Sequence, residues 1–113
     1  MVARNQLLTA QPYPVEQALK LLGHNLRIAR LRRLHTIDDV AEKIGTGTRA
    51  VRDAENGKTS TSIAVYAALL WLYDLLQPFQ YLANPLDDKQ GLALVGRKEK
   101  MRARKDGGLD NDF

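Results

Sequence analysis

The chain contains no cysteine, so it can form neither a disulfide nor a thiolate metal site. Its two histidines, His24 and His35, have no acidic partner at metal-ligand spacing. No apolar run approaches about 18 residues without a charge, so the sequence predicts no membrane-spanning helix. We also expect no secretory signal, because residues 1–13 hold one cation and no sustained apolar block. Together these absences favour a protein of the reducing cytoplasm.

The sequence is equally poor in catalytic motifs. The segment 57–59 resembles the end of a phosphate-binding loop, but Arg52 stands where that loop requires glycine. No nucleophilic cysteine and no Ser-x-Gly elbow are present. The paired aspartates at 38–39 and 87–88 are adjacent, so the members of each pair point apart on a helix. We therefore expect no enzyme, no cofactor and no metal ion.

Positive charge, in contrast, is in excess, with 17 Lys and Arg against 13 Asp and Glu. The excess is uneven along the sequence. Residues 20–58 hold nine cations and five anions, and residues 97–105 hold six cations and one anion. Residues 106–113 hold three aspartates and no cation. A basic balance of this kind favours a polyanionic partner, although each cluster alone is equally well explained as solvated surface.

Apolar spacing predicts an all-α protein without strands of useful length. The first long helix carries one apolar stripe, made by Ala18, Leu19, Leu22, Leu26, Ala29 and Leu31. Pro12 and Pro14 precede it as an extended lead-in, with Pro14 able to sit in the first turn. The predicted helices cover residues 15–34, 37–44, 48–55 and 63–76, followed by shorter helical turns near 79–82 and 87–97. From residue 98 onward we expect fraying and then disorder.

Residues 36–58 predict two short helices joined by a glycine turn. Thr36 is placed to cap the first of them, with Asp39 in the reciprocal position of a capping box. Gly45 ends that helix by supplying a left-handed residue. In the second helix the inward positions are Ala50, Val51 and Ala54, and the outward positions are Thr48, Arg49, Arg52 and Asp53.

Such a helix pair is suited to DNA. Two helices at a steep angle allow one to rest on the backbone while the other enters the major groove. The free N–H groups and positive dipole at a helix start hold a phosphate. Arg49 and Arg52 carry the guanidinium that binds guanine at two atoms at once. Asp53 either accepts from cytosine or repels wrong sequences.

The helix predicted at 63–76 is apolar almost all round, and Ser60 and Ser62 are its candidate caps. Pro78 is expected to end it. A helix of this kind lies either in the centre of a core or in an interface. Trp71 is accordingly either a buried core aromatic or a dimer contact. The predicted dimer interface is Trp71, Leu72 and Leu75.

Several of these positions agree with a known family. The chain resembles the Xre/Cro-type helix-turn-helix of phage repressors in Val40-Ala41-x-x-Ile44-Gly45, Ala50-Val51 and Glu55-Asn56-Gly57-Lys58. The resemblance extends back to Leu22-Gly23-x-x-Leu26-Arg27-x-x-Arg30. It implies an all-α, five-helix lambda-repressor-like domain with a short helical C-terminal extension.

The resemblance also implies a role for individual residues. The bases are read by Thr48, Arg49, Arg52 and Asp53, and the phosphates are contacted by Gly47, Asn56, Lys58 and Arg27. Arg30 and Glu55 form an ion pair between the first and third helices, the alternatives for Arg30 being a phosphate ligand or a free surface cation. Two positions depart from the family pattern. Gly47 replaces the usual Ser or Thr cap, and Ile37 replaces a Gln that reaches a phosphate.

Shorter segments, at residues 62–72, 85–87, 91–94 and 101–104, are similar to HipB-type antitoxins. These antitoxins pair with HipA-type kinase toxins. The similarity implies a cytoplasmic, nucleoid-associated homodimer that represses its own operon through a palindromic double-stranded DNA operator. It also implies a HipA-like kinase toxin as a partner and no membrane association.

Three alternatives stay open: an antitoxin that mainly binds its toxin and binds DNA weakly, a phage or chromosomal repressor without a toxin, and an RNA-binding protein. The expected organisation is a flexible lead at 1–14, the helix-turn-helix domain with its helical extension at 15–97, and a flexible basic then acidic tail at 98–113. The basic run 97–105 either grips flanking phosphate, contacts a partner protein or stays solvated. Residues 106–113 form either a solvated end or a toxin-docking segment.

Overall fold

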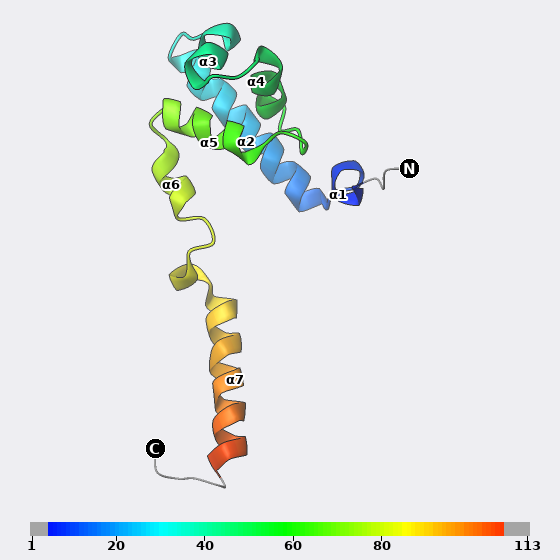
Figure 1. The fold of residues 1–113 in the computed structure, drawn as a ribbon, viewed down its shortest axis with the longest axis vertical. Helices are drawn as coiled ribbons and strands as arrows, with labels where there is room; N and C mark the ends of the chain where they lie inside the picture. Colours follow the sequence, from blue (N-terminus) through cyan, green and yellow to red (C-terminus); the bar gives the residue numbers. More distant parts are fainter. Residues whose placement is uncertain (1–4, 108–113) are drawn as a thin grey trace. The chain divides into compact units, whose positions relative to one another are not determined.

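The computed structural model describes residues 5–107, and within this range the chain contains helices and no strand (Figure 1). The chain divides into two compact units, Met1–Phe79 and Gln80–Phe113. The elements are α1 (Gln6–Thr9), α2 (Tyr13–Arg32), α3 (Ile37–Ile44), α4 (Thr48–Glu55), α5 (Ile63–Leu72), α6 (Leu76–Gln80), the 3₁₀ helix η1 (Pro85–Asp87) and α7 (Lys89–Gly107). The all-α prediction is confirmed.

The long helix α2 begins and ends two residues before the predicted 15–34. It begins early because Pro14 occupies its first turn, where a fixed φ and a missing N–H are tolerated. It ends early because Leu34 adopts a left-handed φ of 59°. The His35 N–H then returns to the Arg30 carbonyl at 3.2 Å, which closes the helix end.

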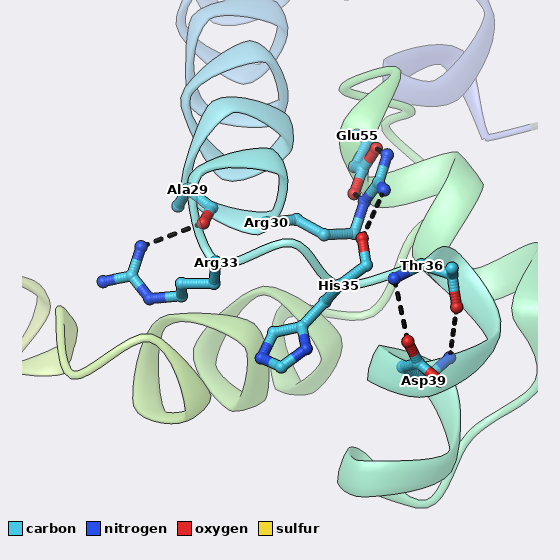
Figure 2. A network of polar contacts seen from close by, with 7 residues as sticks. All are labelled: Ala29, Arg30, Arg33, His35, Thr36, Asp39 and Glu55. Carbon is cyan, nitrogen blue, oxygen red and sulfur yellow. Dashed lines mark hydrogen bonds and ion pairs between the residues drawn. The ribbon is translucent and has the colours of Figure 1, made fainter.

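The capping box predicted for α3 is present (Figure 2). The Asp39 N–H donates to the Thr36 hydroxyl oxygen at 3.0 Å, and the Thr36 N–H donates to the Asp39 carboxylate at 3.0 Å. This backbone hydrogen bond from Thr36 lowers the pKa of Asp39 below its ordinary value. Gly45 ends the helix with φ 77°, as predicted. Local sequence therefore fixes both ends of α3.

Two glycines allow α2 and the end of α4 to approach closely. A Cβ atom on Gly23 would lie 2.5 Å from the carbonyl oxygens of both Ala54 and Glu55. A Cβ atom on Gly57 would lie 2.5 Å from the Leu19 carbonyl oxygen, and Gly57 also has a φ of 66°. Only glycine fits either position without moving backbone, so these two residues set the distance between the two helices.

The apolar helix α5 is shorter than the predicted 63–76. Ser62 caps it by accepting the Ala64 N–H at 3.1 Å. It ends at Leu72, because Asp74 takes a left-handed φ of 59° and the Leu75 N–H donates to the Leu70 carbonyl at 2.8 Å. Pro78, which was expected to break this helix, instead lies within α6. A proline is tolerated there because it falls in the first turn of a new helix.

The core of the first unit lies between α2, α3, α4 and α5. Its buried apolar residues are Leu26, Ala29, Val40, Ala41, Val51, Ala54, Tyr66, Leu69 and Tyr73. The predicted stripe of α2 is too wide, because Ala18 and Leu31 are exposed. The interpretation of Trp71 as a core aromatic is wrong, since this side chain is 63% exposed.

The second unit contains η1 and α7. Asn84 caps η1 by accepting the Leu86 N–H at 3.0 Å. The helix α7 runs to Gly107, so the expectations of a helix ending near residue 97 and of fraying from 98 are wrong. Residues 98–105 are mostly Lys, Arg, Glu, Met and Ala, all strong helix formers, and no proline interrupts them. Predictions for residues 108–113 lie outside the described range.

Near the other end of the described range, α1 occupies part of the predicted flexible lead. Asn5 caps it by accepting the Leu7 N–H at 3.0 Å. None of the helices in residues 5–107 combines the length and apolar character that a bilayer crossing requires.

Candidate nucleic-acid interface

The helix α4 has one face in the core and the other in solvent. Val51 and Ala54 are completely buried, whereas Arg49 and Arg52 are exposed. Thr48, Asp53 and the inward-predicted Ala50 are partly buried. Packing against α2, α3 and α5 therefore holds α4 in place while its arginines stay available.

The first turn of α4 has no side-chain cap. Gly47 occupies the N-cap position with extended backbone, and no side chain accepts a hydrogen bond there. The N–H groups of the first turn consequently lack a side-chain acceptor, and the helix dipole adds partial positive charge at the same place. This end of α4 fits an anionic partner, as expected for the predicted phosphate contact at Gly47.

Arg30 and Glu55 form an ion pair that ties α2 to the end of α4 (Figure 2). Arg30 Nε lies 2.7 Å from Glu55 Oε2, and Arg30 Nη2 lies 3.0 Å from Glu55 Oε1. Arg30 Nη1 also donates to the His35 carbonyl at 3.0 Å. The hydrogen bonding of the Arg30 guanidinium to the Glu55 carboxylate, which accepts, raises the pKa of Arg30. With Arg30 only 7% exposed, this guanidinium positions α4 and is not a free surface cation.

Beside this ion pair lies a shallow hollow of about 260 Å³, which we call the arginine hollow. It is lined by Arg27, Arg30, Ile37, Arg52, Glu55 and Asn56. Arg27, Arg52 and Asn56 are exposed around it, and they come from α2, α4 and the residue that follows α4. The structure thus brings together two predicted phosphate contacts and one predicted base-reading arginine. Ile37, the departure from the family pattern, contributes an apolar wall.

Lys58, another predicted phosphate contact, is held near the same face. Its Nζ atom lies 3.9 Å from Asp53 Oδ2, and its N–H donates to the Asp53 carbonyl at 3.0 Å. The Tyr66 hydroxyl donates to the Lys58 carbonyl at 3.1 Å. The loop after α4 is therefore fixed to α5, while the exposed Lys58 side chain forms a long ion pair with Asp53.

Tyr66 is a positioning residue that was not predicted from the sequence, where this tyrosine stands among the apolar residues of its helix. The available signal was its phenolic oxygen, since a buried tyrosine usually hydrogen-bonds with that group. Burial raises the pKa of Tyr66, so the hydroxyl stays a hydrogen-bond donor at neutral pH.

The residues predicted for a dimer interface lie at the end of α5 and just after it. Trp71 is 63% exposed and Leu75 is 44% exposed, whereas Leu72 is partly buried against the core. The preceding turns of α5 add the exposed Ile63, so the outer side of this helix stays apolar. An apolar side of this extent is available for contact with another protein surface.

Comparison with known proteins agrees with this geometry. Residues 26–73 match the family model described as Helix-turn-helix. The matched segment contains α3, α4, α5 and the whole arginine hollow. On this match and the all-helical fold, residues 26–73 form an Xre/Cro-like helix-turn-helix domain, which supports a DNA-binding transcriptional regulator. No curated protein and no solved structure matches the chain.

Proposed function

We propose that the chain is a sequence-specific repressor that binds a palindromic operator as a homodimer in the cytoplasm and has no enzyme activity. In this proposal α4 enters the major groove, with Thr48, Arg49, Arg52 and Asp53 facing the bases. Arg27, Gly47, Asn56 and Lys58 contact the phosphates. The two copies of α4 lie about 34 Å apart, one turn of the duplex, because a twofold dimer reads two half-sites.

One observation carries this proposal. The arginine hollow places exposed Arg27, Arg52 and Asn56 around a fixed ion pair, while α4 extends Arg49 on its solvent side. Phosphate-binding and base-reading groups are therefore held by one packed set of helices. Such rigid support is what a DNA-reading helix requires, because bidentate contacts to a base depend on an accurate angle.

The test distinguishes the residues proposed to read bases from those proposed to contact phosphates. Arg49→Ala should lower operator affinity by about 1–3 kcal/mol and relax one base position, because it removes a bidentate contact. Lys58→Ala should weaken all sequences alike and lower the salt slope by about 1, because it removes a phosphate contact. Affinities for a selected operator and for random duplexes measure both effects. Equal losses by the two variants on random DNA would overturn the assignment of roles.

The dimer has its own test. Trp71→Ser should shift the protein toward monomer in sedimentation analysis, because this side chain is exposed in a single copy and is proposed to be buried between two. Leu86→Ser, at a leucine that is 82% exposed in the second unit, is the matched control. A Trp71→Ser protein that stays dimeric contradicts the proposed interface.

We further propose that the regulated operon encodes a HipA-like kinase toxin and that the chain binds it. This proposal rests on the similarity of residues 62–72, 85–87, 91–94 and 101–104 to HipB-type antitoxins. Co-expression with the product of the adjacent gene, followed by co-purification, tests it. Retention of a kinase-like partner supports the antitoxin. No retention, with a persisting shift of upstream DNA, supports a repressor without a toxin.

The two remaining alternatives differ from the proposed repressor in whether the chain binds DNA and in which nucleic acid it prefers. An antitoxin devoted to its toxin would retain the partner but fail to shift upstream DNA at low salt. An RNA-binding protein would prefer structured RNA in a competition gel against double-stranded DNA. The proposed repressor prefers the duplex in that gel, because A-form RNA has a deep and narrow major groove that excludes a helix such as α4.

A further inference from the structure

The helix α7 is apolar in its first part and basic in its second. Residues 91–96, its apolar half, contain Leu92, Leu94 and Val95 and no charge. Residues 97–105, its basic half, contain six cations and one anion. Every side chain of the basic half is exposed. Such a concentration of cations within one segment of a helix is costly through mutual repulsion unless an anionic partner offsets it.

Apart from Glu99, no anion among the described side chains neutralises the basic half. None of its cations lies within 4.0 Å of a carboxylate in the part of the chain that the structure describes, and the ion pairs found there all lie in the first unit. Glu99 is the one anion of the segment. The side chains of the basic half therefore remain available for binding.

Helical geometry arranges these cations in two rows. With about 100° between successive residues, Arg97, Lys100 and Arg104 project within about 60° of one another. Lys98, Arg102 and Lys105 form a second row, about 140° around the helix from the first. Between the rows lie Leu94 and the 64% exposed Met101. The opposite side holds Val95, Glu99 and Ala103.

We propose that the basic half of α7 is a second DNA-contacting element, which lies along a duplex groove with one row of cations on each flanking phosphate strand. This inference rests on the proposed function, because α4 brings the same chain to DNA. The basic half is about 12 Å long at 1.5 Å per residue. Six cations over that length match about seven phosphate charges, given one charge per 1.7 Å of duplex axis.

The pattern favours DNA over a bilayer or a protein. An interfacial helix on a membrane needs a continuous apolar side opposite its cations, and here that side carries Glu99. A protein partner would need apolar anchors among the cations, and Met101 is the one large apolar side chain between Arg97 and Lys105. Two cation rows separated by a narrow apolar strip instead match two phosphate strands on either side of a groove.

The experiment measures binding of the full chain to a random-sequence duplex of about 40 base pairs between 50 and 200 mM salt. One triple variant, R97Q/K100Q/R104Q, removes the first row, and another, K98Q/R102Q/K105Q, removes the second. Each should lower the slope of log affinity against log salt by about 2–3, because each released phosphate contact contributes about 0.9. Glutamine is a good helix former, and circular dichroism verifies that α7 persists.

The controls separate this inference from the proposed function. Glu99→Gln, on the opposite side, should leave the slope unchanged. If both triple variants keep the wild-type slope while Arg49→Ala still loses operator affinity, α7 does not bind DNA and the repressor proposal stands. A slope change for one row alone overturns the groove placement. Unchanged DNA binding combined with lost retention on immobilised polyglutamate assigns the basic half to an acidic protein partner instead.

Discussion

The first unit of the chain fixes some of its charges by packing and pairing, whereas the basic half of α7 in the second unit leaves its charges in water. In the first unit, Arg30 is buried and paired with Glu55, and Arg33 donates to the Ala29 and Tyr73 carbonyls at 2.9 Å while lying over the Tyr73 ring. In the second unit, the basic half of α7 is exposed and makes no ion pair with a described carboxylate. Charge that is paired or hydrogen-bonded to neighbouring helices holds those helices at set positions, whereas charge left in water is available to a partner.

The largest expected effect comes from exchanging a paired anion for a neutral amide. Glu55→Gln should lower the free energy of unfolding by about 3–5 kcal/mol, because Arg30 would keep its charge in a buried place without a carboxylate. Urea unfolding measures the loss. Glu99→Gln in α7 is the matched control and should change stability by less than about 0.5 kcal/mol, since Glu99 is exposed. Equal effects would remove the distinction between the two units.

The second test places a methyl group on a helical glycine in each unit. Gly23→Ala should destabilise by about 1–3 kcal/mol, because its Cβ would meet two backbone carbonyls of α4. Gly96→Ala should stabilise α7 by about 0.5–1 kcal/mol, because nothing lies within 4 Å of its Cβ and alanine has the higher helix propensity. Urea unfolding of the first variant and circular dichroism of the second measure these opposite signs. A stabilised Gly23→Ala protein would contradict the close approach.

The third test concerns Tyr73, which is 1% exposed and whose hydroxyl has no hydrogen-bond partner among the residues that the structure describes. Tyr73→Phe should raise stability at neutral pH by about 1 kcal/mol, because an unsatisfied buried hydroxyl is removed. Burial raises the pKa of Tyr73 to about 12 from its ordinary value of 10.0. The wild-type stability linked to this group is complete below pH 10 and is lost as the pH rises through about 12.

The alkaline arm of that test compares unfolding of wild type and variant between pH 10 and 12. The advantage of Tyr73→Phe should widen with pH, since phenylalanine has no proton to lose. The same substitution at Tyr81, which is 58% exposed in the second unit, is the matched control. A pH-independent difference at Tyr73 would contradict the burial of its hydroxyl.

The smallest effect is expected at the capping box. A backbone hydrogen bond from Thr36 lowers the pKa of Asp39 from 3.8, so the stability it contributes is present above pH 3.8 and is lost as the pH falls through the lowered value. Asp39→Asn should abolish this acid-linked loss, which thermal unfolding across the acid range measures. Asp38→Asn, which leaves the capping box intact, is the matched control.

Local signals in the sequence predicted part of this fold correctly. The bounds of α3 and α4 follow from Thr36, Asp39, Gly45 and Gly47, whose effects act within a few residues. The ends of α2 and α5 were missed, because Leu34 and Asp74 take left-handed conformations that neither residue type announces. The length of α7 was also underestimated, because the basic segment from residue 98 was expected to fray although its residues are good helix formers.

The candidate site, like the fold, was predicted from the sequence only in part. Spacing correctly predicted that Arg49 and Arg52 face solvent, whereas Thr48 and Asp53 are partly buried. The ion pair of Arg30 and Glu55 was predicted through a family resemblance. The arginine hollow and the Tyr66 link to Lys58 could not, since both join residues from different helices. The assigned roles of these residues on DNA remain predictions.

The sequence by itself determined the kind and order of the helices around α4, because caps, glycines and apolar spacing act over a few residues. The tertiary structure alone decided which cations are fixed and which are available. Arg30 and Arg52 have the same side chain, yet one is buried against Glu55 and the other is exposed on α4. That difference arises from the packing of α2 against α4, and burial of a charge depends on neighbours that are distant in sequence.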